Sequence, residues 1–405
     1  MSVSESTLSP DHDVRTIGLV SGAHGISHFY QLVLPPLFPI LHFEEGYSFT
    51  ELGLLIAIFY LVSGVVQPLA GFLVDRIGPR SVLYFGIALA SLACSAYALA
   101  DNLNAFIVLV IVAGVGNGVF HPADYTVLSH NVSERRVGKG FSFHAFGGYI
   151  GYAIAPVVMV TLASLFGWRG ALLAAGFVGF AFLVLLISTG HRLVQVGTDT
   201  AGATPRAMKD HAALLLSPVV IGCFLFFCVA AMAQIGLQTF APSALLKLFE
   251  IEITVSNIGV TVFLVAVTIG ILSGGVLADR TQRHHLVTVL CLIPPAAMTL
   301  LPAWFDLSPL SLWIVFAIIG FFFGLLIPSR DMLVRAAAPR HSSGKVFGVV
   351  YSGLDVGSAL TPIAFGWFLD HALAHWVFLG AAICFVAGIG AIALSRLNIT
   401  IASNA

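Results

Sequence analysis

Hydrophobic residues follow one another along most of this chain in long runs, separated by short polar stretches. A helix needs about 20 apolar residues to cross the roughly 30 Å hydrocarbon core of a bilayer. Twelve runs reach that length: 15–42, 50–74, 81–100, 103–129, 139–165, 168–190, 214–248, 253–278, 285–304, 308–336, 345–369 and 373–396. The first and seventh runs are longer than a straight crossing needs, and we expect their prolines to tilt or break these helices. The pattern predicts an all-α membrane protein with twelve transmembrane helices.

Composition points the same way, because 58% of the residues are apolar and 9% are charged, against about 25% charged in soluble domains. A net charge of -1 gives no sign of a nucleic-acid partner. The five cysteines lie inside apolar runs without metal-ligand spacing, so we interpret them as small hydrophobic residues. No nucleotide-binding loop, nucleophile motif or metal motif occurs. We therefore expect neither an enzyme nor a cofactor.

Positive charges are unevenly distributed around the predicted spans. If the N-terminus is cytoplasmic, fourteen Lys and Arg residues fall on the cytoplasmic side, and two, Arg169 and Lys247, fall on the other. Cytoplasmic loops of membrane proteins are enriched in Lys and Arg. The distribution predicts that both termini are cytoplasmic.

The chain also repeats itself. A shift of 206 residues superimposes Gly114, Gly118, Pro122, Gly138, Lys139, Phe141, Gly147, Gly151, Ala153 and Pro156 on Gly320, Gly324, Pro328, Gly344, Lys345, Phe347, Gly353, Gly357, Ala359 and Pro362. Glycine and proline mark close helix approach and kinks, so the repeat predicts two six-helix bundles of the same shape. We expect an N-terminal tail (1–14), an N-terminal bundle (15–190), a cytoplasmic linker (191–213), a C-terminal bundle (214–396) and a C-terminal tail (397–405).

Two loops carry a shared signature, "GFLVDRIGPR" at 71–80 and "GVLADRTQRH" at 275–284. Both resemble the G-x-L-x-D-R loop of the major facilitator superfamily, with departures at Pro79 and Gln282. The residues concerned are Gly71, Asp75, Arg76 and Arg80 in the first copy, and Gly275, Asp279, Arg280 and Arg283 in the second. Together with "FHP" at 120–122 and the histidines of the first span, the chain resembles the bacterial fosmidomycin-resistance-type branch of exporters. The resemblance implies a monomeric transporter of small molecules in the lipid bilayer of a bacterial inner membrane.

The loop carboxylates suggest a conformational latch. Asp75 can accept hydrogen bonds from exposed amides at the start of span 345–369, and Asp279 can do so at span 139–165. A carboxylate at a helix N-terminus contributes roughly 0.3–1 kcal/mol when exposed, which suits a contact that opens in every cycle. The alternative is a tight turn whose charges only set the topology.

Span 103–129 places His121 and Asp124 three residues apart, on one helix face. A charge at this depth costs several kcal/mol unless it is paired or hydrated, so we expect this face to line a central cavity. Pro122 and its counterpart Pro328 predict hinges. The 206-residue shift carries Asp124 onto Arg330, beside Asp331. Three interpretations remain open: a salt bridge between the halves that gates the cytoplasmic side, an arginine that binds an anionic substrate, and a static pair that aids assembly.

Further polar residues lie within the spans. His24, His28 and Gln31 form a stripe on the first span, and Gln234 and Gln238 form its counterpart on the seventh. The resemblance implies that the first, fourth, seventh and tenth helices line the cavity. Other candidates are His144, Tyr149, Tyr152, Tyr351 and Asp355. We expect at least one of the histidines to titrate during turnover, because imidazole has an ordinary pKa of about 6.5; the alternative is hydrogen-bonded packing.

A metal site is not expected, because among the four candidate histidines only His24 and His28 have helical ligand spacing. The preferred function is proton-coupled export of a small organic molecule by alternating access. The glycine–proline pattern of antiporters is present only in diluted form, as Gly147, Gly148, Gly151 and Pro156, so direction is not set by motif. Uptake of an organic anion with protons, and a receptor that does not transport, are the alternatives.

Overall fold

The computed structural model describes residues 10–190, 217–337 and 343–403. In this part of the chain the regular elements are helices, without a strand, which confirms the all-α class. The elements are α1 (Pro10–Gln31), the 3-10 helix η1 (Pro35–Leu37), α2 (Phe38–Glu45), α3 (Phe49–Ile77), α4 (Pro79–Tyr97), α5 (Leu103–Gly118), α6 (Phe120–Asn131), α7 (Glu134–Thr189), α9 (Pro218–Phe249), α10 (Ile253–Arg280), α11 (His284–Thr299), α12 (Leu301–Trp304), α13 (Pro309–Ala337), α14 (Ser343–Asp370) and α15 (His375–Ser403). The predicted linker 191–213 lies outside the described residues.

Nine helical stretches among the described residues are long and apolar enough to cross a membrane. One of them, Lys139–Thr189, contains two of the predicted spans, 139–165 and 168–190. The predicted spans 15–42 and 345–369 are largely helical but are not among the nine. The number twelve and the cytoplasmic position of both termini stay predictions.

The helices are interrupted at particular residues. The first predicted span breaks into α1, η1 and α2 around Pro35, as its prolines suggest, whereas α9 continues through Pro242. Helix α7 contains one non-helical residue, Gly167, with a φ of 70° and a ψ of 167°. This left-handed region favours glycine because it has no Cβ. The turn therefore falls between the two predicted spans that α7 contains.

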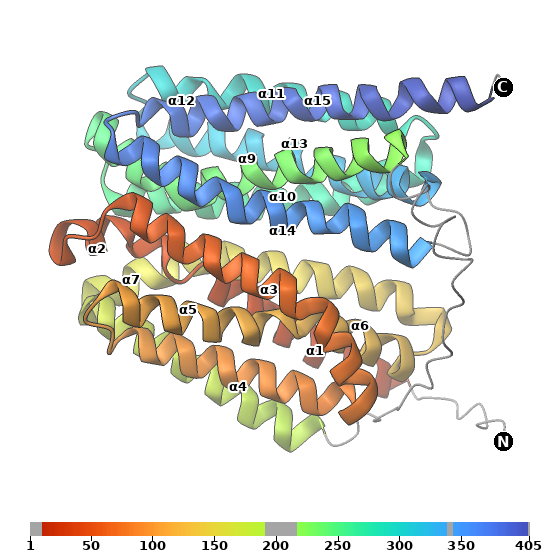
Figure 1. Cartoon of the computed structure of the whole chain (residues 1–405), viewed down its shortest axis with the longest axis horizontal. Helices are drawn as coiled ribbons and strands as arrows, with labels where there is room; N and C mark the ends of the chain where they lie inside the picture. Colours follow the sequence, from red (N-terminus) through yellow and green to blue (C-terminus); the bar gives the residue numbers. More distant parts are fainter. Residues whose placement is uncertain (1–9, 191–216, 338–342, 404–405) are drawn as a thin grey trace. The chain divides into compact units, whose positions relative to one another are not determined.

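Contacts divide the chain into two compact units. One comprises Met1–Leu37 and Leu61–Thr200, and the other comprises Phe38–Tyr60 and Ala201–Ala405. In the first unit α1 packs along α7 and α6, and α4 packs against α5 and α7. In the second, α9 packs on α14 and α15, while α13 packs on α10 and α11 (Figure 1). The grouping differs from the predicted division, 15–190 and 214–396, in the segment Phe38–Tyr60.

A hydrogen-bonded contact ties this segment to the second unit. Asp370, the last residue of α14, accepts hydrogen bonds from the backbone N–H of Phe49 at 2.8 Å and of Thr50 at 2.7 Å, and from the Thr50 hydroxyl. These amides open α3, where no intrahelical acceptor exists and the helix dipole favours an anion. A Cβ on Gly53 would lie 2.1 Å from the Pro362 carbonyl oxygen, so α3 and α14 approach closely here.

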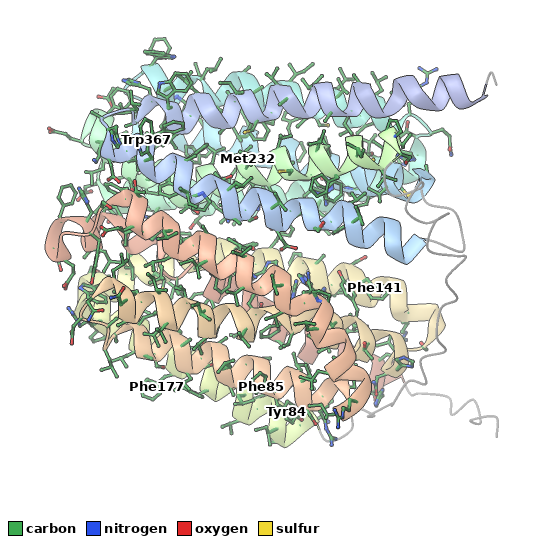
Figure 2. The ribbon with its side chains drawn as sticks, viewed as in Figure 1. Tyr84, Phe85, Phe141, Phe177, Met232 and Trp367 are labelled. Carbon is green, nitrogen blue, oxygen red and sulfur yellow. The ribbon has the colours of Figure 1, made fainter. Side chains whose placement is uncertain are left out.

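The outer surfaces of the units are apolar. Phe85, Phe177 and Trp367 expose 48%, 67% and 45% of their surface and point away from the helices that carry them (Figure 2). Exposed apolar surface on this scale suits contact with lipid tails rather than water.

Glycines bring α1 and α7 together in the first unit. A Cβ on Gly151 would lie 2.0 Å from the Gly25 carbonyl oxygen, and one on Gly147 would lie 2.5 Å from that of Ser21. The equivalent residues of the second unit behave alike, because a Cβ on Gly357 would lie 2.2 Å from the Cys228 carbonyl oxygen. This is the close helix approach that the repeat predicts.

Replacing Gly151 with Ala should lower the unfolding temperature of the detergent-solubilised protein by several degrees. The added methyl group must push α1 away from α7, and overpacking of this kind costs about 1–3 kcal/mol. Gly18→Ala is the matched control on α1, because no atom of the described residues lies within 4 Å of the position its Cβ would take. Equal unfolding temperatures for the two variants would contradict the close approach.

Replacing Asp370 with Ala should speed hydrogen exchange at the start of α3. The amides of Phe49 and Thr50 lose their acceptor, and an N-terminal carboxylate contributes up to about 2 kcal/mol in a partly buried position. Exchange measured by mass spectrometry on a peptide covering residues 48–55 reads this out. Asp306→Ala, at an exposed loop position, is the control; unchanged exchange in the Asp370 variant would show that the contact does not hold α3.

Candidate functional site

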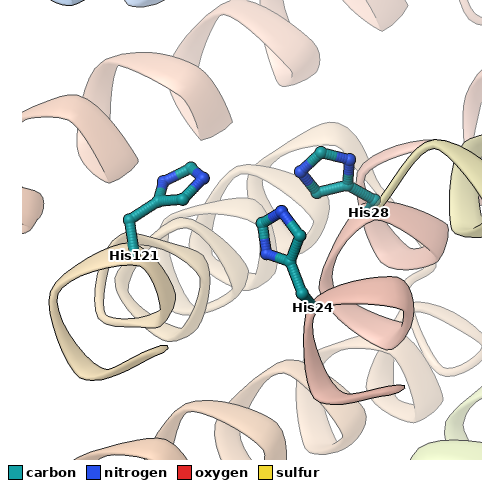
Figure 3. Close-up of side chains that lie close together, drawn as sticks. All are labelled: His24, His28 and His121. Carbon is teal, nitrogen blue, oxygen red and sulfur yellow. The ribbon is translucent and has the colours of Figure 1, made fainter. Parts of the chain in front are cut away.

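Five ionisable side chains from three helices meet inside the first unit. His24 and His28 stand one turn apart on α1, His121 and Asp124 lie on α6, and His144 lies on α7. Figure 3 shows the His24 ring between those of His28 and His121. The ring centroids are 4.2 Å apart for His24 and His28 and 5.1 Å apart for His24 and His121. We call these five residues the imidazole–carboxylate cluster.

The break between α5 and α6 accounts for a proline at position 122. The helix is interrupted at Val119, so Pro122 occupies the first turn of α6. Amides in a first turn have no intrahelical acceptor, and a proline there removes no helical hydrogen bond. Pro328, by contrast, lies inside the continuous helix α13. A hinge at Pro122 or at Pro328 stays a prediction.

Gly148 makes room for the imidazoles of α1. A Cβ at this position would lie 2.7 Å from Cδ2 of His24 and 2.9 Å from Cε1 of His28. The glycines of α7 therefore do more than shorten the distance between two backbones. They leave the space that the rings of His24 and His28 fill.

Asp124 lies at the centre of the cluster and has no exposed surface. Its Oδ2 lies 3.0 Å from Nε2 of His144 and 3.5 Å from Nδ1 of His24. The His24 and His144 rings stack, with centroids 3.7 Å apart and an interplanar angle of 19°. A buried carboxylate is costly unless it is paired. The imidazoles of His144 and His24 are the ionisable groups nearest to this carboxylate.

Several polar atoms of the cluster have no hydrogen-bond partner among the described residues. They are Nδ1 of His24, Nδ1 of His28 and Oδ1 of Asp124. At 3.5 Å the His24–Asp124 approach is an ion-pair distance rather than a good hydrogen bond. Unpartnered buried polar atoms cost about 1–3 kcal/mol each. They remain available to a proton or a ligand.

A ladder of uncharged polar groups adjoins the cluster. Tyr152 donates its hydroxyl to Oε1 of Gln31, whose Nε2 donates to Oδ1 of Asn117 at 3.0 Å. Ser27 donates to the same oxygen at 2.8 Å, and Nδ2 of Asn117 donates to Ser63 at 2.8 Å. Gln31 and Tyr152 were predicted from the sequence; Asn117, Ser27 and Ser63 were not. Asn117 stands four residues before His121, a spacing that could have indicated it.

Tyrosines border the cluster. The Tyr125 ring stacks on that of His121 at 6.0 Å and lies 5.1 Å from that of His144. Tyr152 lies 4.2 Å from His28, and Tyr149, another predicted site residue, lies 6.2 Å from Tyr152. Sequence analysis did not single out Tyr125, although it follows Asp124 directly.

A second polar group lies in the other unit. Arg330 is buried, its Nε donates to Oδ1 of Asp331 at 3.0 Å, and its guanidinium covers the Phe227 ring at 4.2 Å. The Phe227 ring lies 4.9 Å from that of Tyr351. On α9, Nε2 of Gln234 lies 3.4 Å from Oε1 of Gln238, a long hydrogen bond. Asp355 lies half-buried on α14, one turn after Tyr351.

The predicted pair of Asp124 and Arg330 remains untested. Each residue has an oppositely charged or ionisable partner within its own unit, His144 and Asp331 respectively. The predicted latch also remains a prediction, because the side chains of Asp75 and Asp279 lie outside the described part of the chain. Of the other latch residues, Arg76, Arg280 and Arg283 are exposed and Arg80 is half-buried. Open space surrounds Gly71 and Gly275.

The cluster also contains two groups of side chains that could hold a metal ion. Two sets of three ligands have donor atoms within 4.8 Å of one another: His24, His28 and His121, and His24, Asp124 and His144. The sequence argument against a metal rested on His24 and His28 being an isolated pair. The fold brings ligands from α6 and α7 to the same place as His24 and His28, a convergence that spacing along the sequence does not show.

Comparisons with known proteins identify the family. The sequence pattern of the Major Facilitator Superfamily matches residues 20–256 and 224–400. The chain is 24% identical over 373 residues to the fosmidomycin resistance protein of Escherichia coli (strain K12), covering 89% of this chain and 88% of that protein. It is 26% identical over 376 residues to the MFS-type transporter YfnC of Bacillus subtilis (strain 168), covering 90% and 88%.

The fold is also similar to a solved transporter. A bacterial homologue of the human lysosomal transporter Spinster, in an inward-facing and unoccupied conformation, aligns with a TM-score of 0.75 and 16% identity, covering 96% of this chain and 97% of that one. Family members are transporters rather than enzymes. The chain belongs to the Major Facilitator Superfamily and is a multi-pass transporter of the cell membrane.

Proposed function

We propose that this protein is a proton-coupled secondary transporter that exports a small organic molecule by alternating access. The observation that carries the proposal is the fully buried Asp124, held between the imidazoles of His144 and His24. Imidazole changes charge near neutral pH. The cluster therefore has the chemistry of a proton carrier placed inside a membrane transporter.

A single titrating group supplies enough energy. One charge moved through 100 mV corresponds to about 2.3 kcal/mol, so a potential of about 150 mV provides about 3.5 kcal/mol. Because each 1.4 kcal/mol is a factor of ten, one proton supports an accumulation of a few hundredfold. No nucleotide-dependent motor is needed.

The adjoining ladder suggests how a proton and a substrate share this unit. When a proton leaves, Asp124 and its imidazoles lose their neutral pairing, and the cost of the uncompensated charge favours a rearranged set of contacts. Gln31 stands on α1 one turn after His28 and reaches both Tyr152 and Asn117. A change of protonation at His24 or His28 can therefore shift Gln31 and its hydrogen-bond partners, which are polar groups suited to bind a substrate.

Relatives support export. Besides the fosmidomycin resistance protein, the multidrug resistance protein MdtG of Citrobacter koseri is 24% identical over 374 residues, covering 89% of this chain and 88% of that protein. We also propose that the protein works as a monomer in a bacterial inner membrane. Latch contacts at Asp75 and Asp279 and hinges at Pro122 and Pro328 belong to the same proposal.

Arg330 favours a second candidate, the uptake of an organic anion with protons. Arg330 exposes 7% of its surface. Its guanidinium lies over the Phe227 ring, beside Asp331. A desolvated arginine binds carboxylates and phosphonates by paired hydrogen bonds. Asp124 would serve as the proton carrier in this case too.

Replacing Asp124 with Asn should abolish gradient-driven transport. The test is flux in proteoliposomes under an imposed pH gradient, with fosmidomycin, ethidium and galactonate as probes. Wild-type protein should accumulate at least one probe against its gradient, whereas the variant should only let it equilibrate. Asp306→Asn is the control. Gradient-driven accumulation by the Asp124 variant at the wild-type level would exclude this carboxylate as the proton carrier.

Replacing Arg330 with Gln should show whether this arginine binds an anionic substrate. If Arg330 binds an anion, the KM for fosmidomycin or galactonate should rise about tenfold or more, since a buried charged partner contributes at least 2 kcal/mol. Ethidium flux should stay within twofold. Equal losses for anionic and cationic probes, together with a lower unfolding temperature, would assign Arg330 a structural role.

A further inference from the structure

We propose that the imidazole–carboxylate cluster binds a divalent transition-metal ion such as Zn²⁺, with His24, Asp124 and His144 as ligands. The inference goes beyond the transport of an organic molecule and does not depend on it. It starts from the two ligand sets that α1, α6 and α7 bring together, both of which include His24.

The donor spacing fits zinc. Zinc binds imidazole nitrogen at about 2.0–2.1 Å and carboxylate oxygen at about 2.0–2.2 Å, in a tetrahedron. Donors in such a tetrahedron lie roughly 3.3–3.4 Å from one another. The observed separations from Asp124 Oδ2, 3.0 Å to His144 Nε2 and 3.5 Å to His24 Nδ1, bracket that value. Binding of one ion also requires the stacked rings of His24 and His144 to turn until both nitrogens point at it.

Two atoms of the ligand residues are also available, whereas Nε2 of His144 would exchange its hydrogen bond with Asp124 Oδ2 for the metal. Nδ1 of His24 and Oδ1 of Asp124 are buried without a hydrogen-bond partner in the described structure, although their residues are 3% and 0% exposed. Groups buried to this extent are normally satisfied, and each exception calls for an explanation. Coordination of a cation would satisfy Nδ1 of His24, and a carboxylate that binds through both oxygens would satisfy Oδ1 of Asp124 as well.

The second ligand set offers an adjacent position. Nδ1 of His121 lies 2.7 Å from Oε1 of Gln67. An amide oxygen only accepts, so His121 carries its proton on Nδ1 and leaves the lone pair of Nε2 free for a metal. Nδ1 of His28 is another unpartnered buried atom. An ion at the first position therefore has further imidazole ligands within a few ångströms.

Ligand type sets the selectivity. Imidazole suits zinc, copper, nickel and iron, whereas magnesium and calcium prefer sites made of oxygen ligands. The ligands must be unprotonated to bind a metal, so binding releases protons and weakens as the pH falls. The metal and the proton compete for the same atoms.

Isothermal titration of the purified, EDTA-stripped full-length protein with ZnCl₂ tests the inference. We expect about one ion per chain bound near neutral pH, with proton release seen as a dependence of the heat on buffer ionisation, and no comparable binding of MgCl₂. The variant carrying Asp124→Asn and His144→Ala should bind zinc at least about 100-fold more weakly. A control carrying Asp306→Asn and His130→Ala, at two exposed positions, should bind as the wild type does.

X-ray absorption at the zinc edge adds a readout that does not depend on the variants' stability. The loaded wild-type protein should show nitrogen and oxygen ligands at about 2.0 Å with imidazole scattering, and no sulfur. Zinc affinity of the double variant within threefold of the wild type, or a sulfur ligand shell, would overturn the inference. Zinc binding without any proton-driven flux would leave it standing and remove the proposed function instead.

Discussion

A carboxylate sealed inside an apolar helical unit is the constraint on which the rest of this structure depends. Asp124 has no exposed surface, and an isolated charge in such a place costs several kcal/mol. The neighbouring helices meet that cost by presenting imidazoles from α1 and α7. Imidazole can take up a proton near neutral pH, whereas an amide or hydroxyl partner could not. The proposed proton coupling rests on this difference between imidazole and other polar partners.

Backbone packing makes this arrangement possible. The imidazoles of α1 can lie against α7 only because Gly148 has no side chain, and α1 reaches α7 only because Gly25 and Gly151 allow their backbones to touch. The break at Val119 places His121, Pro122 and Asp124 together in the first turns of α6. Glycine and proline thus set the geometry, and the histidines and the aspartate supply the chemistry. A longer side chain at Gly148 would occupy the space of the cluster itself.

Sequence patterns predicted much of this. Apolar runs predicted the helices, and the 206-residue repeat predicted the close approach seen at Gly151 and Gly357. Periodicity placed His121 and Asp124 on one face, but it could not show that His144 and His24 would be their partners, because those contacts join residues 20 and 100 positions away. For the same reason, the sequence did not show that His24, Asp124 and His144 lie close enough together to be ligands of one metal ion. Ser63 and Gln67 carried no signal of their own, since their role comes from Asn117 and His121 opposite them.

The central claim is that Asp124 and the imidazoles around it form one titrating unit. Infrared difference spectra recorded between about pH 5 and pH 8, on protein with ¹⁵N-labelled histidine, test it most directly. That interval brackets the ordinary pKa of imidazole, about 6.5. The account predicts isotope-sensitive imidazole bands that change together with a carboxylate band, and that lose this coupling in the Asp124→Asn protein. Identical difference spectra from the wild-type and variant proteins would contradict it.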